Sequence, residues 1–303
     1  MKRYSEVSIP GLSGDSSLSL KGNYFIINAE EQTYYHFMVD QIGQFLYLKS
    51  AIPNLKLLII EQEPGTHSSE YATWCLEKIK ANYEHTSIKL SDYGHIDIEN
   101  ITVISNRLFN FYHLIDNDLK DLLQDNEYLS LVIPHLRHFF LSNISKNDDN
   151  RLDIFVSRDG KAEEVNEVYD KIMSSGGPKT LDDLEKTSRY LTEEEYELIK
   201  SEFKDFVVLD YRETSFQEQL EAVANAKRLV VFVGASVANA FIVREDCEVF
   251  LINTDTAWPL PNYHDAMDMV SPNVHHLLDY REYPNTRNIN LIIQKIRSIA
   301  SAS

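Results

Sequence analysis

The sequence contains little cysteine and little positive charge. Cys75 and Cys247 are the only cysteines in 303 residues, too few for a framework of several disulfides or for a cysteine-based zinc site. The 29 Lys and Arg residues stand against 47 Asp and Glu, which gives a formal net charge of -18. A chain of this charge repels nucleic acid and anionic membrane surfaces at long range. We therefore expect no nucleic-acid partner.

Long hydrophobic runs are also missing. The longest apolar run, residues 229–243, contains Gly234 and Asn239. It falls short of the roughly 20 apolar residues that cross a bilayer as a helix. At the N-terminus, Lys2 and Arg3 are followed by polar residues and not by the apolar core of a signal peptide. We expect a cytoplasmic chain with no transmembrane segment.

The first half of the chain alternates short apolar runs with segments of helical periodicity. Strands are predicted at residues 24–27, 55–60 and 101–104, and helices at residues 34–50, 70–82 and 127–142. In the first of these helices the apolar side chains recur at helical spacing, at Tyr34, Met38, Ile42, Phe45 and Leu48. Strand, helix, strand in this order predicts a parallel sheet.

A second alternating pattern follows a polar stretch at residues 145–150, which we interpret as a linker. Strands are predicted at residues 152–156, 206–209, 229–233 and 249–252, and helices at 163–174, 192–203, 215–225, 235–243 and 286–300. Thr192 with Glu195, and Ser215 with Glu218, have the spacing of helix capping boxes. The sequence thus predicts an α/β protein of two Rossmann-like lobes, residues 1–148 and 149–303.

One strand of the second lobe turns directly into a helix through small residues. Gly234, Ala235 and Ser236 connect the apolar strand 229–233 to the next helix. Small residues at such a turn let a phosphate approach backbone N–H groups at a helix N-terminus. The alternative is a tight turn in which small residues serve packing alone, and one glycine does not separate the two interpretations.

Three other groups are candidates for chemistry. Arg158 directly follows a predicted strand, at the sheet edge where α/β proteins bind ligands, and can pair with a diphosphate or form an ordinary surface salt bridge. His36 and Asp40 share one helix face, which suits a general base with an orienting carboxylate, but also a weak surface pair. Asp116 and Asp118 form an Asp-x-Asp sequence, which can hold a divalent cation on a diphosphate or arise by chance in an acidic chain.

Taken in order, these segments resemble glycosyltransferase family 61. Residues 34–40 are similar to that family's Tyr-Tyr-His-Trp-x-x-Asp/Glu helix, and residues 155–158 to its Ile-Ser-Arg strand end. Arg189, Thr192 and Glu193 are similar to its Arg-x-x-Asn-Glu segment. Residues 233–239 resemble its His-Gly-Ala-Gly-Leu-x-Asn loop, although Val233 replaces the histidine and Ser236 the second glycine. The chain therefore resembles a divergent member.

The resemblance implies a GT-B fold and an inverting transfer, with a nucleoside diphosphate as leaving group and with neither a metal nor a cofactor. The first lobe would bind a glycan acceptor, with His36 or Asp40 as base, and the last helix would pack back on this lobe. The second lobe would bind a nucleotide-sugar donor, expected to be a UDP-sugar. The implied donor-binding residues are Arg158, Arg189, Glu193, Gly234, Ala235, Ser236, Val237 and Asn239.

Two alternatives remain open at this point. A metal-dependent transferase would use Asp116 and Asp118 to hold the cation. A non-catalytic nucleotide-binding or assembly protein would be consistent with Val233, and with the lack of the family's glutamate near Ile252 and Asn253.

Overall fold

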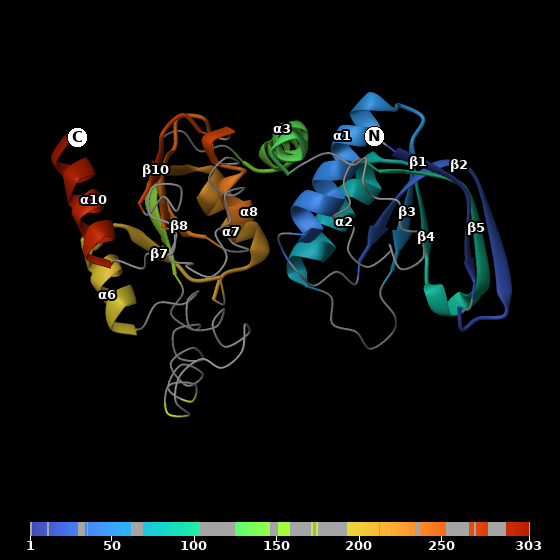
Figure 1. Cartoon of the computed structure of the whole chain (residues 1–303), viewed down its shortest axis with the longest axis horizontal. Helices are drawn as coiled ribbons and strands as arrows, with labels where there is room; N and C mark the ends of the chain where they lie inside the picture. Colours follow the sequence, from blue (N-terminus) through green and yellow to red (C-terminus); the bar gives the residue numbers. More distant parts are fainter. Residues whose placement is uncertain are drawn as a thin grey trace. The chain divides into compact units, whose positions relative to one another are not determined.

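The computed structural model divides the chain into two compact units, Met1–Phe139 and Phe140–Ser303 (Figure 1). The structure describes residues 2–10, 12–29, 34, 36–61, 69–103, 125–145, 151–157, 171, 174, 193–211, 213–233, 237–252, 267–269, 271–277 and 289–302. We describe each unit by itself. The division falls inside a helix, and not in the polar stretch after it that the sequence suggested.

Unit 1 contains a five-stranded sheet of order β1-β5-β2-β3-β4. Its strands are β1 (Lys2–Pro10), β2 (Ser16–Asn28), β3 (Lys56–Ile60), β4 (His85–Ile88) and β5 (Tyr93–Val103). All neighbours are parallel except β1 and β5, which are antiparallel. The strand β3, between β2 and β4, is buried along Leu57, Leu58, Ile59 and Ile60, as expected of a parallel strand covered on both faces.

The first helical segment of unit 1 differs from the prediction of one continuous α-helix. A π-helix, η1 (His36–Gly43), leads into α1 (Gln44–Ala51). The other helices are α2 (Glu70–Asn82), the short 3-10 helix η2 (Leu90–Asp92) and α3 (Asp125–Ser142). Figure 1 shows α1 and α2 on one face of the sheet, where right-handed crossovers from β2 to β3 and from β3 to β4 place them.

Unit 2 contains a parallel sheet of order β10-β9-β8-β6-β7. Its strands are β6 (Leu152–Val156), β7 (Val207–Leu209), β8 (Ala226–Phe232), β9 (Glu248–Ile252) and β10 (Val274–His276). From β6 to β7 the chain moves one way along the sheet, and from β7 to β8 it moves the other way. The order of the strands therefore reverses between the neighbours β6 and β8, and such a switch point is where open α/β sheets bind ligands.

This reversal also distributes the helices of unit 2 over both faces of its sheet. Right-handed crossovers place α6 (Glu193–Glu202) on one face, and α7 (Phe216–Ala224) and α8 (Val237–Ala240) on the other (Figure 1). The capping box predicted at Ser215 is confirmed: the Glu218 N–H donates to Ser215 Oγ, and the Ser215 N–H donates to the Glu218 carboxylate. The predicted helix 235–243 is much shorter, and residues 241–243 form turns.

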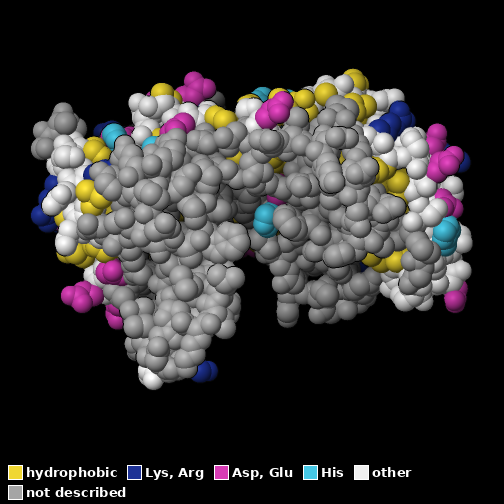
Figure 2. All heavy atoms as spheres, viewed as in Figure 1, with side chains coloured by type: hydrophobic (Ala, Val, Ile, Leu, Met, Phe, Trp, Pro, Cys, Tyr) yellow, Lys and Arg dark blue, Asp and Glu magenta, His cyan; other side chains and the backbone are white. Residues whose placement is uncertain are grey.

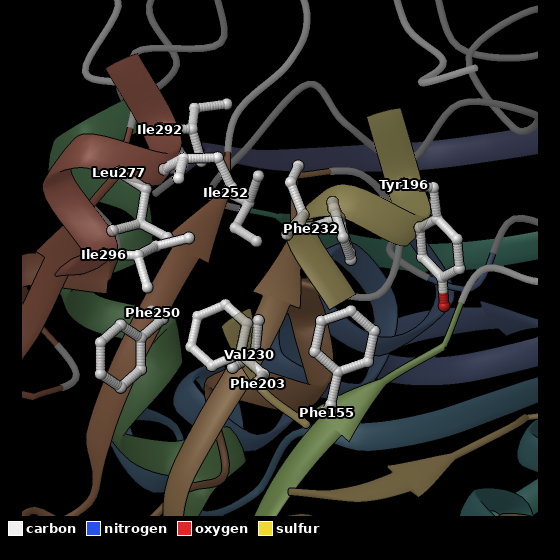
Figure 3. Packing of buried hydrophobic residues seen from close by; sticks show 12 residues of the cluster. Phe155, Tyr196, Phe203, Val230, Phe232, Phe250, Ile252, Leu277, Ile292 and Ile296 are labelled. Atoms are coloured by element: carbon white, nitrogen blue, oxygen red, sulfur yellow. The ribbon is translucent and has the colours of Figure 1, made fainter. Parts of the chain in front are cut away.

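The last helix, α10 (Ile289–Ala302), belongs to unit 2. Ile292, Ile293 and Ile296 are buried in an apolar cluster with Phe203, Phe250 and Leu277 (Figure 3). Arg297 also donates two hydrogen bonds to the Glu202 carboxylate at the end of α6. Its isoleucine stripe thus packs beside α6 within unit 2, and the expectation that this helix also packs back on the first lobe stays a prediction.

The predicted fold class, α/β with two Rossmann-like lobes, is confirmed. A GT-B fold is built from two such lobes. None of the described helices is both long and apolar enough to traverse a bilayer. On the face shown in Figure 2, the described acidic and basic side chains are scattered and do not gather into one patch of a single sign.

Candidate functional site

His36 and Asp40 form a hydrogen-bonded pair on η1. The Nδ1 atom of His36 lies 2.6 Å from Asp40 Oδ2. The Asp40 side chain is completely enclosed, whereas 33% of the His36 side chain is exposed. An ionised Asp40 can only accept a hydrogen bond, so we assign the ring proton of His36 to Nδ1, which leaves Nε2 as the nitrogen that can take up a proton. This is the arrangement in which an enclosed carboxylate orients a histidine base.

The enclosure of Asp40 separates the two roles that the sequence left open. A general base must come within hydrogen-bonding distance of the proton that it removes. The Asp40 carboxylate has no exposed surface, while the His36 ring is partly exposed. The geometry therefore favours His36 as the base and Asp40 as the group that holds its tautomer.

Neighbouring residues fix η1 against the sheet of unit 1. Phe37, Met38 and Val39 are fully buried. The backbone N–H of Asn28, the last residue of β2, donates to Gln41 Oε1 at 2.6 Å. This bond joins η1 to the carboxyl end of the strand that precedes it, so η1 begins at the edge where ligands of parallel sheets bind.

In unit 2 the carboxyl ends of neighbouring strands are held together by backbone hydrogen bonds. The Ser157 N–H donates to Leu209 O at 2.9 Å, and the Val233 N–H donates to Ile252 O at 2.8 Å. Ser157 directly follows β6, and its hydroxyl accepts a hydrogen bond from Tyr196 of α6 at 3.3 Å. Backbone hydrogen bonds thus tie the carboxyl end of β6 to that of β7, and the carboxyl end of β8 to that of β9, on the two sides of the switch point.

Two polar side chains lie at the same edge. Asn239 of α8 is only 3% exposed. Burial of the hydroxyl group raises the pKa of Tyr211, a half-buried residue that follows β7, and the neighbouring Asn239 side chain offsets part of that rise. Gln219 fixes the segment around Tyr211 by donating to Tyr211 O and to Thr214 O. Sequence reasoning missed Tyr211, because no local pattern connects it with Asn239.

The other predicted site residues are distributed as follows. Val237 is buried in α8 beside Asn239, and Glu193 is exposed at the first position of α6. The remaining predicted donor-binding residues lie outside the described residues; they are Arg158, Arg189, Gly234, Ala235 and Ser236. Asp116 and Asp118 also lie outside them. Within the described ranges, no group of three or more His, Cys, Asp or Glu side chains could hold a metal ion.

The chain is thus an α/β protein of two Rossmann-like lobes. The helix η1, which carries an oriented histidine, begins at the edge of the first sheet where ligands bind, and a switch point lies at the corresponding edge of the second. The model of the family Glycosyltransferase 61 matches residues 34–250, about seven-tenths of the sequence. The chain therefore belongs to this family and is a glycosyltransferase. The resemblance drawn from the sequence motifs is confirmed.

Solved structures give weaker similarities, and no curated protein matches the chain. One similar structure is the E. coli heptosyltransferase WaaC with ADP-2-deoxy-2-fluoro heptose, at 14% identity and a TM-score of 0.34. Another is the same enzyme with ADP, at 14% identity and a TM-score of 0.33. Each alignment covers 91% of this chain and 99% of the heptosyltransferase chain.

Proposed function

We propose that this glycosyltransferase moves a sugar, with inversion, from a nucleoside-diphosphate sugar to a hydroxyl group of a glycan acceptor. We expect a UDP-sugar as donor. The observation that carries the proposal is the pair on η1, an enclosed Asp40 carboxylate 2.6 Å from Nδ1 of a partly exposed His36. A one-step inversion needs one such base, on the acceptor side of the sugar.

In the proposed step the acceptor oxygen attacks the anomeric carbon while His36 Nε2 takes the hydroxyl proton. The bond between that carbon and the diphosphate oxygen breaks on the opposite face, and the nucleoside diphosphate leaves with the electron pair. The Asp40 carboxylate stabilises the imidazolium that forms. The reaction thus yields the glycosylated acceptor, the nucleoside diphosphate and one proton on His36.

We place the donor at the carboxyl edge of the unit 2 sheet, beside β6 and β8. The support is the strand reversal at this point, together with the buried Asn239 at the same edge. Arg158 and Arg189 would compensate the leaving charge, with N–H groups of residues 234–237. Because α8 has four residues, its dipole is small and the arginines carry most of the compensation. No metal enters this proposal.

A transfer assay tests the proposed base. A thermal-shift screen with nucleotide-sugars first identifies the donor, since a ligand of the native state raises the melting temperature. His36→Ala and Asp40→Asn should then each lower kcat, by on the order of 10²- to 10⁴-fold for a lost general base, with donor affinity unchanged. The double variant should be little worse than the more damaging single variant, because the two groups act as a unit.

His85→Ala is the matched control, since His85 is an exposed histidine of the same unit whose Nδ1 lies 3.0 Å from the backbone oxygen of Tyr83. It should keep the wild-type rate. If both His36→Ala and Asp40→Asn turned over donor at the wild-type rate, the pair would be structural and the proposed mechanism would be wrong.

A further inference from the structure

We propose that Tyr128 is a positioning residue for the His36–Asp40 pair, an inference that rests on the proposed function of His36. Tyr128 lies on α3, far from η1 in the sequence. Its hydroxyl donates to Val39 O at 2.9 Å, a bond that spans 89 residues and is buried. Both Tyr128 and Val39 are completely enclosed, and Val39 directly precedes Asp40.

The π-helical turn explains why side-chain donors are needed here. A π-helix bonds i to i+5, and its hydrogen-bond register changes where α1 begins at Gln44. Tyr128 donates to the carbonyl of Val39, and Gln44 Nε2 donates to the carbonyl of Asp40 at 2.9 Å. The carbonyl groups of Val39 and Asp40 thus each accept a hydrogen bond from a side chain, and these two bonds are not part of the backbone bonding of the helix.

The hydroxyl of Tyr128 ties this π-helical turn to α3, and the loss of a hydrogen bond at an enclosed carbonyl is destabilising. Without this bond, η1 can relax toward the α-helical register. This change rotates the residues before the π-helical turn relative to those after it. The Asp40 carboxylate then no longer holds His36 Nδ1 in one orientation.

One face of α3 fixes the position of the hydroxyl. Tyr128, Val132 and Leu136 follow each other at intervals of four on this helix, so they share one face. A Cβ atom built at Gly43, the last residue of η1, would meet the side chains of Val132 and Leu136. The close backbone approach at Gly43 therefore brings this face of α3 against η1, with Tyr128 one turn before Val132.

The test variant is Tyr128→Phe, which removes the hydroxyl and keeps the ring. We expect kcat to fall about tenfold, as for other partners that orient a functional histidine, with KM and donor affinity unchanged. The ¹⁵N spectrum of the His36 ring should change from a single Nδ1–H tautomer to a mixture. A loss of stability alone would not produce that spectral change.

Ile98→Val is the control for stability. Ile98 is a buried residue of β5 in the same unit, and this substitution removes one buried carbon atom at a loss of stability comparable with that of one lost hydrogen bond. It should leave kcat and the His36 spectrum unchanged. Gln44→Met removes the second side-chain donor with little change in volume. If Tyr128→Phe does not fold, a wild-type kcat and a single His36 tautomer in Gln44→Met would overturn the proposed role of these side-chain donors.

A folded Tyr128→Phe protein with the wild-type kcat and a single His36 tautomer would overturn the proposal. An equal loss of kcat in Ile98→Val would also overturn it, because the effect would then be one of general stability. A wild-type rate in His36→Ala would overturn the proposed function instead, and the His36 spectrum would still decide the role of Tyr128.

Discussion

The contact between Gly43 and α3 predicts a specific energetic coupling. Gly43 has φ -62° and ψ -43°, so alanine suits its backbone and should gain about 0.5–1 kcal/mol from helix propensity. However, a Cβ atom there falls closer than 3.0 Å to Val132 Cγ1, on a fully buried side chain. Overpacking of this kind costs about 1–3 kcal/mol. We expect Gly43→Ala to lower the free energy of unfolding by about 1–2 kcal/mol.

Val132→Ala should reverse the sign of this effect. Alone, it loses two buried methyl groups and leaves a cavity, at a cost of about 2 kcal/mol or more. In the Val132→Ala protein, the methyl group that Gly43→Ala adds enters that space, so Gly43→Ala becomes stabilising by about 0.5–1 kcal/mol. The double-mutant cycle should therefore give a favourable coupling of about 2 kcal/mol.

Urea unfolding of the four proteins, followed by far-UV circular dichroism, measures this cycle. Ser50→Ala on α1 is the control, because Ser50 is exposed and should show no coupling to Val132. If the costs of Gly43→Ala and Val132→Ala were simply additive, the packing of α3 against η1 described here would be wrong.

The remaining predictions concern the donor site and acid stability. Arg158→Lys should lose on the order of 2–4 kcal/mol of transition-state stabilisation in the transfer assay, because an ammonium cannot pair bidentately with a diphosphate; full activity would make Arg158 a surface residue. Gly234→Asp should abolish nucleoside-diphosphate binding in calorimetry and keep the fold, and unchanged affinity would remove the site from this loop. A chelator should leave transfer unchanged, whereas a strict Mg²⁺ or Mn²⁺ requirement would point to Asp116 and Asp118. The Arg228 guanidinium lowers the pKa of Asp153 by hydrogen bonding. The hydrogen-bonded pair therefore stabilises the folded protein fully above about pH 3.9, the pKa of Asp153 in the unfolded chain. This stabilisation is lost as the pH falls through the lower pKa of Asp153 in the folded protein. The difference in unfolding free energy between wild type and Arg228→Met should shrink between pH 7 and about pH 3, and a constant difference would contradict this linkage.

The sequence predicted the buried parallel strands and their helices well. The bounds of α2 and β6 match the predicted ranges, because each is an apolar pattern of one period between clear breaks. The capping box at Ser215 was found for the same reason, since its partners are three residues apart. Elements defined by local physics can be predicted from a single sequence.

Three features could not be predicted, because their causes are distant in the sequence. The apolar spacing of η1 is compatible with either an α- or a π-register, and the hydrogen bond from Tyr128 to this segment comes from a residue 89 positions away. The strand β1 is polar, and its pairing with β5 creates it. The isoleucine stripe of α10 indicates a buried face but not which lobe covers it.

The candidate site shows the same division. The pairing of His36 with Asp40 was predicted from a spacing of four, and the structure brings the two side chains together. Their roles required the burial of Asp40, which no sequence pattern gives. The closeness of Tyr211 to Asn239 depends on the strand order in unit 2, which no local pattern gives.

The antiparallel strand β1 has a consequence for how the chain is synthesised and folds. Its partner β5 is made much later: Ser8, for example, bonds Asp97, which is 89 positions further along the chain. The central strand β2 also pairs with β5, so β1 and one edge of β2 stay unpaired until β5 has left the ribosome. Non-local pairing of this kind slows folding and exposes strand edges to aggregation. Unit 1 should therefore be the part of the chain that depends most on chaperones during translation.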